Sequence, residues 1–321
     1  MRRSGRTVVV MTTIGSSDLD VSRLCLGGNV FGWTIDEDDS FAVLDAYVAA
    51  GGNFIDTADS YFWRKPGNSG GESETIIGNW MAARGNRDSV VIATKVGNLP
   101  SRPGLSAANI AEATDDCLRR LRTDRIDLMY AHKDDESVAQ EETLDAFATL
   151  VKAGKVRTLG ASNFTAERLR SALEISDRDG LPRYEAVQPH YNLMERNDFE
   201  ASQAPLLQAE DIACLPYYAL AKGFLTGKYR DGGPSVDSVR AEGALEYLDD
   251  RGRAVLAALD EIAAGHEVPV AAVALAWLAA QPTVAAPIAS ARTPEQLAAL
   301  LPVLDLDLTD DELRLLSHVS D

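Results

Sequence analysis

Three short apolar runs stand between residues 53 and 132: Asn53-Phe-Ile-Asp56, Val90-Val-Ile-Ala-Thr-Lys95 and Ile126-Asp-Leu-Met-Tyr-Ala-His132. Each run is bounded by helical sequence, so each is predicted to be a buried parallel strand. A polar residue ends each run, and a tyrosine follows the first run closely. Parallel strands that alternate with helices bring their carboxyl ends to one edge of the sheet. Four polar side chains are therefore expected to meet on one surface: Asp56, Tyr61, Lys95 and His132.

Strand and helix patterns go on alternating along the rest of the chain. Eight strands are predicted, at residues 24–27, 53–56, 90–95, 126–132, 158–162, 186–188, 212–217 and 284–288. Eight such units within about 280 residues favour an α/β fold of the (β/α)8 TIM barrel type over an open sheet. A short N-terminal hairpin over residues 12–21 is predicted to precede the barrel. An extra C-terminal helix, which begins at the capping box Thr309-Asp-Asp-Glu312, is predicted to follow it.

Residues 11–321 are interpreted as one domain, because no segment rich in Pro, Gly or Ser divides them. Residues 1–10 are predicted to be a disordered lead-in, and Met11 is a candidate for the true start. The apolar stretch near the N-terminus is too short for a signal peptide, and no stretch of membrane-spanning length follows it. The three cysteines fit neither a disulfide framework nor a zinc motif. They are expected to be core thiols of a cytoplasmic protein.

Composition limits the classes of partner. Hydrophobic residues make up 45% of the chain and charged residues 25%, which is the ordinary balance of a globular protein. The formal net charge of -18 argues against nucleic acid, since binding a phosphate backbone relies on Lys and Arg. An anionic cofactor remains compatible with this charge only if positive side chains gather locally.

Three stretches are longer than a barrel requires, at residues 31–39, 61–71 and 219–250. Each follows the carboxyl end of a predicted strand, where a barrel builds its active site. These stretches are predicted to form a substrate pocket. Its candidate lining residues are Trp33, Phe62 and Trp63 within the stretches and Asn29 shortly before the first of them. Loop anchors and contacts to a partner protein are alternative roles for the aromatic residues.

The predicted cluster of a lysine, a carboxylate, a phenol and an imidazole suits proton-coupled chemistry on a carbonyl or an alcohol. Lys95 is costly to bury alone, so Asp56 on the adjacent strand is its expected partner. A structural ion pair is the alternative interpretation of these two residues. A cation beside the Tyr61 phenol is expected to lower its pKa and make it a general acid near neutral pH. His132 is expected to orient a carbonyl oxygen.

The chain resembles the aldo-keto reductases from about Gly15 to the C-terminus. The matching motifs stand in the same order as in that family: Phe54-Ile-Asp-Thr-Ala58 before Tyr61, Ala93-Thr-Lys-Val96, Leu128-Met-Tyr-Ala-His132, Gly160-Ala-Ser-Asn-Phe164, Val187-Gln-Pro-His-Tyr-Asn192, Gly223-Phe-Leu-Thr-Gly-Lys-Tyr229 and Ala291-Arg-Thr-Pro-Glu-Gln296. The resemblance implies that Tyr61 is the general acid, that Lys95 and Asp56 tune it, and that His132 positions the substrate. It also implies that a nicotinamide cofactor delivers a hydride.

No G-x-G-x-x-G fingerprint follows a predicted strand, and residues 223–228 are one residue short of a P-loop. By the resemblance, the cofactor is instead held by residues at the ends of later strands and in the loops after them: Ser162, Asn163 and Gln188 at the carboxamide, Tyr217 stacked on the nicotinamide ring, and Leu220, Lys222, Ser290, Arg292 and Gln296 along the remainder. Other interpretations stay open for two of them. For Lys222 a solvated surface lysine is the favoured interpretation over a contact to the pyrophosphate, and Gln296 is equally a helix-capping residue.

Arg292 stands just before a predicted helix start at Thr293, which favours a 2′-phosphate and hence NADP over NAD. The chain departs from the family pattern nearby. Tyr218-Ala219 stand where the family commonly has Ser-Pro, Ala289-Ser290 where it often has Pro-Gly, and Leu300 where it often has Asn. These departures bear on cofactor affinity and selectivity rather than on the proton chemistry.

The leading hypothesis is a cytoplasmic NADPH-dependent oxidoreductase that reduces an aldehyde or a ketone. The second is an NADP-binding regulatory subunit of the potassium-channel β-subunit type. A metal-dependent hydrolase is a third, although the histidines lack a metal-ligand spacing and no metal site is predicted. A small carbonyl compound is the expected partner, with no nucleic acid and no membrane. The sequence leaves the substrate, the reaction direction and the oligomeric state open.

Overall fold

The computed structural model describes residues 10–230 and 239–321. Eight parallel strands form one curled sheet in the order β11-β10-β9-β8-β5-β4-β3-β12. Their bounds are Cys25–Gly27 (β3), Phe54–Asp56 (β4), Val91–Val96 (β5), Ile126–Ala131 (β8), Val156–Ser162 (β9), Tyr184–Gln188 (β10), Ala213–Cys214 (β11) and Ile288–Ala289 (β12). The eight predicted strands are therefore confirmed, although the seventh is shorter than predicted and the eighth is both shorter and shifted, since it begins at Ile288, where the predicted strand ends.

Hydrogen bonds between the last two strand segments close the sheet into a barrel. The backbone N–H of Cys214 donates to Thr283 O (2.7 Å), and the N–H of Ala285 donates to Cys214 O (2.9 Å). Pro216 and Pro287 stand within these segments and have no N–H to donate, which shortens the regular ladder on each side. The N–H of Ile288 still reaches Pro216 O (3.0 Å). The (β/α)8 barrel prediction is confirmed.

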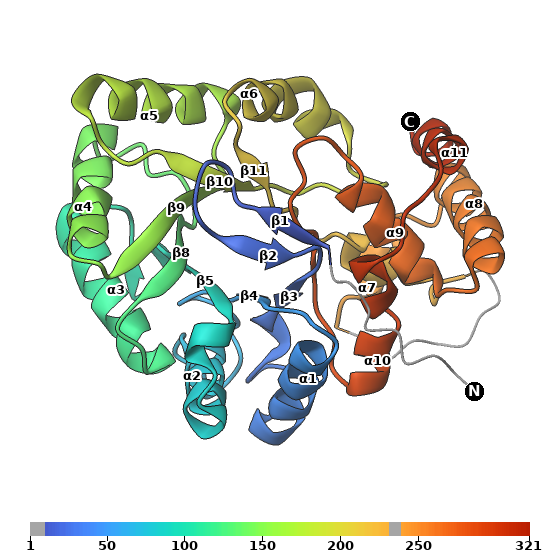
Figure 1. The fold of residues 1–321 in the computed structure, drawn as a ribbon, viewed down its shortest axis with the longest axis horizontal. Coiled ribbons are helices and arrows are strands. Elements are labelled where there is room, and N and C mark those ends of the chain that lie inside the picture. The colour runs from blue at the N-terminus through green and yellow to red at the C-terminus, as the bar shows by residue number, and fades with distance from the viewer. Residues whose placement is uncertain (1–9, 231–238) are drawn as a thin grey trace.

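Helices surround the sheet, as Figure 1 shows. Those that follow the strands around the barrel are Glu37–Ala49 (α1), Glu72–Arg84 (α2), Ala107–Leu121 (α3), Gln140–Lys152 (α4), Ala166–Asp179 (α5), Ala204–Ala209 (α6), Val270–Ala279 (α9) and Pro294–Ala298 (α10). Side-chain oxygens of Asp36, Ser106 and Thr165 accept backbone N–H groups at the starts of α1, α3 and α5. The left-handed Gly85 and Gly180 end α2 and α5.

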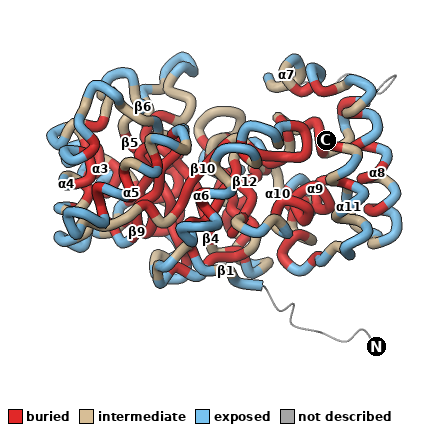
Figure 2. Tube along the Cα trace, turned by 90° about the horizontal axis from the view of Figure 1, so that it is seen from above, coloured by how far each residue is buried: buried red, intermediate tan, exposed pale blue. Residues whose placement is uncertain are grey.

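Two clusters of buried apolar side chains form the core of the protein. Figure 2 shows that the buried residues, in red, run along the strands and along one side of the surrounding helices. The N-terminal hairpin, with strands Met11–Thr13 (β1) and Asp20–Ser22 (β2), crosses one end of the barrel in Figure 1. Its Ile14 and Leu19 belong to the same buried cluster as Phe54 and Leu128 from inside the barrel. The hairpin prediction is confirmed, and this end of the barrel is closed. The opposite end, where the strands finish, is the end at which barrels of this type carry their active sites.

Further elements decorate the barrel. A small hairpin pairs Asn98–Leu99 (β6) with Arg102–Pro103 (β7), and Ala241–Leu245 (α7) precedes Asp250–His266 (α8). The predicted C-terminal helix is Asp310–Val319 (α11), and it begins at the predicted capping box, with Thr309 and Glu312 bonded reciprocally. It packs against α8, so these two helices form a pair at the edge of the barrel.

The predicted lead-in at residues 1–10 lies, apart from Val10, outside the described residues. One domain over residues 11–321 stays a prediction. In the described ranges, no single helix has both the length and the apolar composition needed to cross a bilayer.

Candidate functional site

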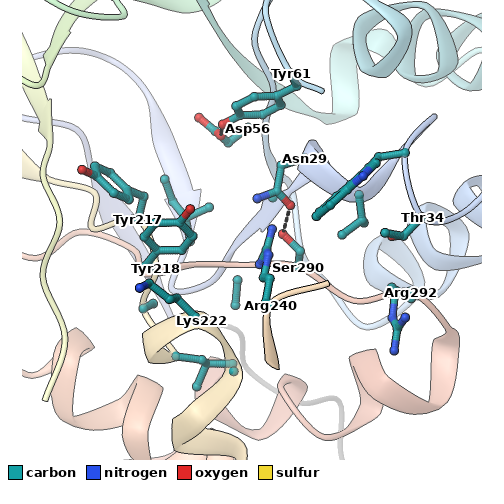
Figure 3. Close-up of a pocket in the computed structure, with 18 of the residues that line it drawn as sticks. Asn29, Thr34, Asp56, Tyr61, Tyr217, Tyr218, Lys222, Arg240, Ser290 and Arg292 are labelled. Carbon is teal, nitrogen blue, oxygen red and sulfur yellow. Dashed lines mark hydrogen bonds between the residues drawn. The ribbon is translucent and has the colours of Figure 1, made fainter. Parts of the chain in front are cut away.

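A pocket of about 760 Å³ lies at the carboxyl ends of the strands. All of the predicted site residues line it except Lys95, which lies behind Asp56, and Trp63. Figure 3 shows Asp56 and Tyr61 together at one end of the pocket and Arg292 at the other side, with Arg240 and Ser290 between them. The barrel thus brings together residues that are more than 200 positions apart in the chain.

Asp56, Lys95 and Tyr61 form one hydrogen-bonded cluster. Lys95 Nζ lies 2.7 and 2.8 Å from the two carboxylate oxygens of Asp56 and 2.6 Å from the Tyr61 hydroxyl. It also donates to Thr57 O at 2.7 Å, and the Tyr61 hydroxyl donates to Asp56 Oδ2 at 2.7 Å. Lys95 and Asp56 are each 1% exposed. Such burial is tolerated because the ammonium and the carboxylate satisfy each other.

The electrostatics of this cluster differ from the sequence-based expectation. Burial and the Asp56 carboxylate raise the pKa of Tyr61 well above its usual value, where a lowered pKa was predicted from the neighbouring lysine. The pKa of Lys95 is lowered, mainly by burial. Removal from water disfavours the phenolate, and Asp56 adds a like charge beside it. The phenol therefore keeps its proton at neutral pH and is available as a donor.

His132 lies beside this cluster with its ring edge-on to that of Tyr61, at 6.2 Å between centroids. Its Nδ1 is 3.1 Å from Ser60 Oγ. Burial, and then the positive charge of Lys95, lower the pKa of His132 to about 3. The imidazole is therefore neutral at physiological pH and carries a single N–H.

The amide and hydroxyl groups after β9 and β10 are bonded to the cluster and to one another. Gln188 Nε2 donates to Asp56 Oδ1 (2.9 Å), and Ser162 Oγ donates to Gln188 O (3.0 Å). Asn163 Nδ2 donates to His132 O (2.9 Å), and its Oδ1 accepts from the Tyr217 hydroxyl (3.1 Å). Asn163 adopts a left-handed backbone conformation, which Asn tolerates. These bonds fix the wall of the pocket next to Tyr61.

Positive side chains gather on another part of the pocket wall. Four cationic residues line the pocket, Lys222, Lys228, Arg240 and Arg292, whereas Asp56 is the one carboxylate among the lining residues that the structure describes. This local excess stands out in a chain of formal net charge -18. Sequence reasoning missed Lys228 and Arg240. Both residues lie in the long stretch 219–250 that follows a strand end, and a positive charge at such a place in an acidic protein could have indicated them as pocket residues.

Two aromatic side chains, Trp33 and Phe62, line the pocket together with Tyr61. The rings of Trp33 and Phe62 are stacked at 3.4 Å between centroids with 7° between planes. The Arg240 guanidinium lies over the Trp33 ring at 5.5 Å. Trp63, predicted as pocket lining, is not a lining residue, and its ring instead packs against Arg64.

The last βα unit supplies the remaining predicted contacts. Ser290 Oγ donates to Asn29 Oδ1 at 2.7 Å. Thr293 caps α10 by accepting from Gln296 N, while Gln296 Oε1 accepts from the backbone N–H of Arg292 at 3.0 Å. Gln296 therefore has a structural role at the start of α10. Lys222, which also lines the pocket, pairs with Glu246 at 3.1 Å.

A buried carboxyl group, Asp59, lies behind the site. It is 1% exposed, and neither oxygen has a hydrogen-bond partner among the described residues. Burial and the carboxylate of Glu74 raise the pKa of Asp59 to about 7. In the unfolded chain the pKa is about 4. Folded protein thus binds a proton that unfolded protein has released, so stability falls as the pH rises from about 4 to about 7.

Asp59→Asn is expected to remove this pH dependence. The measured quantity is the unfolding free energy of the variant minus that of the native protein. This difference is expected to be roughly 2–4 kcal/mol more favourable to the variant above about pH 7 than near pH 4. Urea unfolding at several pH values measures the difference. Asp38→Asn, at an exposed position on α1, is the control. An Asp59→Asn effect of the same size at every pH contradicts the account.

Comparison with known proteins adds a separate line of evidence. A family model described as the aldo/keto reductase family matches residues 23–321. The protein tas of Escherichia coli (strain K12) is 35% identical over an alignment that covers 94% of this chain and 94% of its own. The norsolorinic acid reductase stcV of Emericella nidulans is 34% identical over 91% of this chain and 76% of its own. A probable voltage-gated potassium channel subunit beta of Oryza sativa subsp. japonica is 33% identical over 91% and 90%.

Fold and pocket define a (β/α)8 barrel with a buried proton-bearing cluster and a cationic wall at the strand ends. The chain belongs to the aldo/keto reductase family. The resemblance predicted from the sequence motifs is confirmed. Relatives named as reductases support an oxidoreductase.

Proposed function

We propose that this protein is an NADPH-dependent oxidoreductase that reduces an aldehyde or a ketone to the alcohol, with Tyr61 as the general acid. The observation that carries the proposal is the Asp56–Lys95–Tyr61 cluster at one end of a pocket whose wall is cationic. A protonated phenol next to a space for a small molecule suits reduction of a carbonyl group, because the product oxygen needs a proton.

The lining residues fit a nicotinamide dinucleotide phosphate. Lys222, Lys228, Arg240 and Arg292 supply positive charge for an anionic cofactor within an acidic protein. Tyr217 offers an aromatic face, and its hydroxyl is held by Asn163. When bound, the nicotinamide supplies the hydride that a carbonyl reduction requires. We assign Arg292 to the 2′-phosphate, as a guanidinium matches phosphate geometry.

The residues of the cluster then have separate roles in moving a proton. Tyr61 gives its proton to the substrate oxygen as negative charge develops there. Lys95 Nζ, 2.6 Å from that hydroxyl, stabilises the phenolate that remains. Asp56 holds Lys95 in place with two short contacts. His132, neutral because of its lowered pKa, is able to donate a hydrogen bond to the carbonyl oxygen without carrying charge.

The stacked rings of Trp33 and Phe62 favour a planar or apolar carbonyl compound over a sugar. One relative carries the name norsolorinic acid reductase, so norsolorinic acid is a compound to test as a substrate. The three cysteines are buried free thiols, which supports a reducing, cytoplasmic compartment.

Cofactor consumption tests the proposal. Purified protein is expected to oxidise NADPH in the presence of some member of a panel of aromatic aldehydes, aliphatic aldehydes, diketones and keto-sugars, and to do so faster than with NADH. A second candidate function, a cofactor-binding subunit with little turnover, is favoured by the 33% identity to the rice channel subunit. NADPH binding without turnover of any panel member selects this second function.

Arg292→Leu is expected to weaken NADPH binding roughly 10- to 100-fold while NADH binding changes little, because a charged hydrogen bond to phosphate contributes about 1.5–3 kcal/mol. Fluorescence titration with both cofactors measures the effect. Arg314→Leu, on the outer helix α11 and away from the pocket, is the matched control. An equal loss for both cofactors contradicts the assignment of Arg292 to the 2′-phosphate.

A further inference from the structure

Ser60 stands one residue before Tyr61 and contacts the ring of His132. Its side chain is nearly buried, at 7% exposure, and it lines the pocket. Ser60 Oγ lies 3.1 Å from His132 Nδ1. Among the described residues, Ser60 is the hydrogen-bond partner of Nδ1. The other ring nitrogen, Nε2, has no hydrogen-bond partner among these residues.

This contact decides where a neutral imidazole carries its hydrogen. His132 is neutral at physiological pH, because burial and Lys95 lower its pKa to about 3. A neutral ring has one N–H, and the hydrogen bond made by one nitrogen determines which nitrogen holds it. If Ser60 donates, Nδ1 is the acceptor and Nε2 carries the hydrogen. If Ser60 accepts, the hydrogen is on Nδ1 and Nε2 has only a lone pair.

The surroundings of Ser60 favour donation to the ring. A serine that accepts from Nδ1–H must send its own hydrogen elsewhere, and a buried hydroxyl without an acceptor is costly. The neighbouring carboxyl group of Asp59 is the competing acceptor, but within residues 10–230 and 239–321 neither of its oxygens has a hydrogen-bond partner in normal geometry. Burial and then Glu74 on α2 raise the pKa of Asp59 to about 7, while the nearby Ser60 hydroxyl, Arg120 on α3 and Lys95 on β5 lower it. The raised pKa makes Asp59 a weaker competitor for the Ser60 hydrogen as the pH falls below about 7.

We propose that Ser60 is a positioning residue that donates its hydroxyl hydrogen to Nδ1 of His132 and thereby holds the imidazole in the Nε2–H tautomer. Nε2–H is then a neutral hydrogen-bond donor for the oxygen of a carbonyl substrate. The catalytic half of this inference rests on the proposed carbonyl reduction. The tautomer itself is a property of the protein alone.

Nuclear magnetic resonance of the imidazole nitrogens tests the tautomer directly. The chain has four histidines, so protein labelled with nitrogen-15 at histidine gives few signals. His132→Gln identifies the signals of His132 by their loss. In the native protein at a pH near 6.5, Nε2 of His132 is expected to have the shift of a protonated nitrogen and Nδ1 that of an unprotonated one. The opposite pattern overturns the proposal.

Three serine variants connect the tautomer with turnover. Ser60→Ala is expected to mix the two tautomers and to lower kcat for carbonyl reduction on the order of 10-fold, with the KM for NADPH unchanged. Ser60→Thr keeps a hydroxyl and is expected to restore the native nitrogen pattern and most of kcat. Ser176→Ala removes a buried hydroxyl on α5, outside the pocket, and is the matched control for loss of a buried hydrogen bond.

The outcomes separate this inference from the proposed function. An unchanged nitrogen pattern in Ser60→Ala contradicts the role of Ser60, whatever the turnover. The expected patterns in a protein that reduces no carbonyl compound support the tautomer assignment and contradict the proposed function. If Ser60→Ala shifts the tautomer but leaves kcat as in the native protein, the catalytic half of the inference is wrong.

Discussion

Tyr61→Phe is expected to lower kcat for carbonyl reduction by roughly 10²- to 10⁴-fold, the usual contribution of a general acid. The substitution removes a single hydroxyl group, which donates to Asp56 Oδ2 and accepts from Lys95 Nζ. Lys95 keeps its contacts to Asp56 and to Thr57 O, so the buried charges remain satisfied. NADPH binding is expected to change by less than about threefold, which is the effect of a weak hydrogen bond, because no contact to the cofactor is assigned to the Tyr61 hydroxyl. Steady-state kinetics and fluorescence titration measure the two quantities.

Tyr184→Phe is the matched control for this substitution. Tyr184 is buried at the start of β10, at the opposite end of that strand from Gln188. Loss of its hydroxyl leaves the pocket unchanged and is expected to leave kcat near the native value. Native turnover in Tyr61→Phe contradicts the assignment of Tyr61 as proton donor.

Lys95→Met is expected to have the largest effect on stability. It removes the ammonium that neutralises Asp56, and both groups are 1% exposed. A buried carboxylate left without its partner costs about 3–5 kcal/mol of unfolding free energy. Turnover is also expected to be lost, because the Tyr61 phenolate then has no cation beside it. Urea unfolding at neutral pH measures the change in stability.

Pairing this variant with a second substitution isolates the charge effect. In Lys95→Met combined with Asp56→Asn, the uncompensated charge is absent, so part of the lost stability is expected to return. The combined variant remains inactive. If Lys95→Met alone has the same unfolding free energy as the native protein, the claim that the buried ion pair is needed for stability is wrong.

The sequence was sufficient for most of the barrel and for the grouping of the central residues. Short apolar runs separated by helical patterns predict strands, and eight of them predict a closed sheet. Placement of Asp56, Lys95 and His132 at strand ends then predicts that they lie on one rim. The structure brings Asp56, Lys95 and Tyr61 within hydrogen-bonding distance, with His132 beside them.

Other features depend on packing that a linear pattern does not contain. The seventh and eighth strands are short because Pro216 and Pro287 interrupt their ladders. The direction of the Tyr61 pKa depends on the depth of burial and on Asp56, both of which oppose the phenolate. Arg240 reaches the pocket from a long connecting stretch, and Trp63 turns away from it. Side-chain direction in such stretches follows from tertiary contacts rather than from periodicity.

Transfer of a labelled hydride tests the central claim most directly. Native protein is incubated in ordinary water with a reactive aldehyde and NADPH that carries deuterium at the transferable position, and the alcohol is analysed by mass spectrometry. The account predicts an alcohol with one deuterium on the former carbonyl carbon, and far less of it from Tyr61→Phe. An alcohol without carbon-bound deuterium, or no alcohol from any substrate that the site admits, contradicts it.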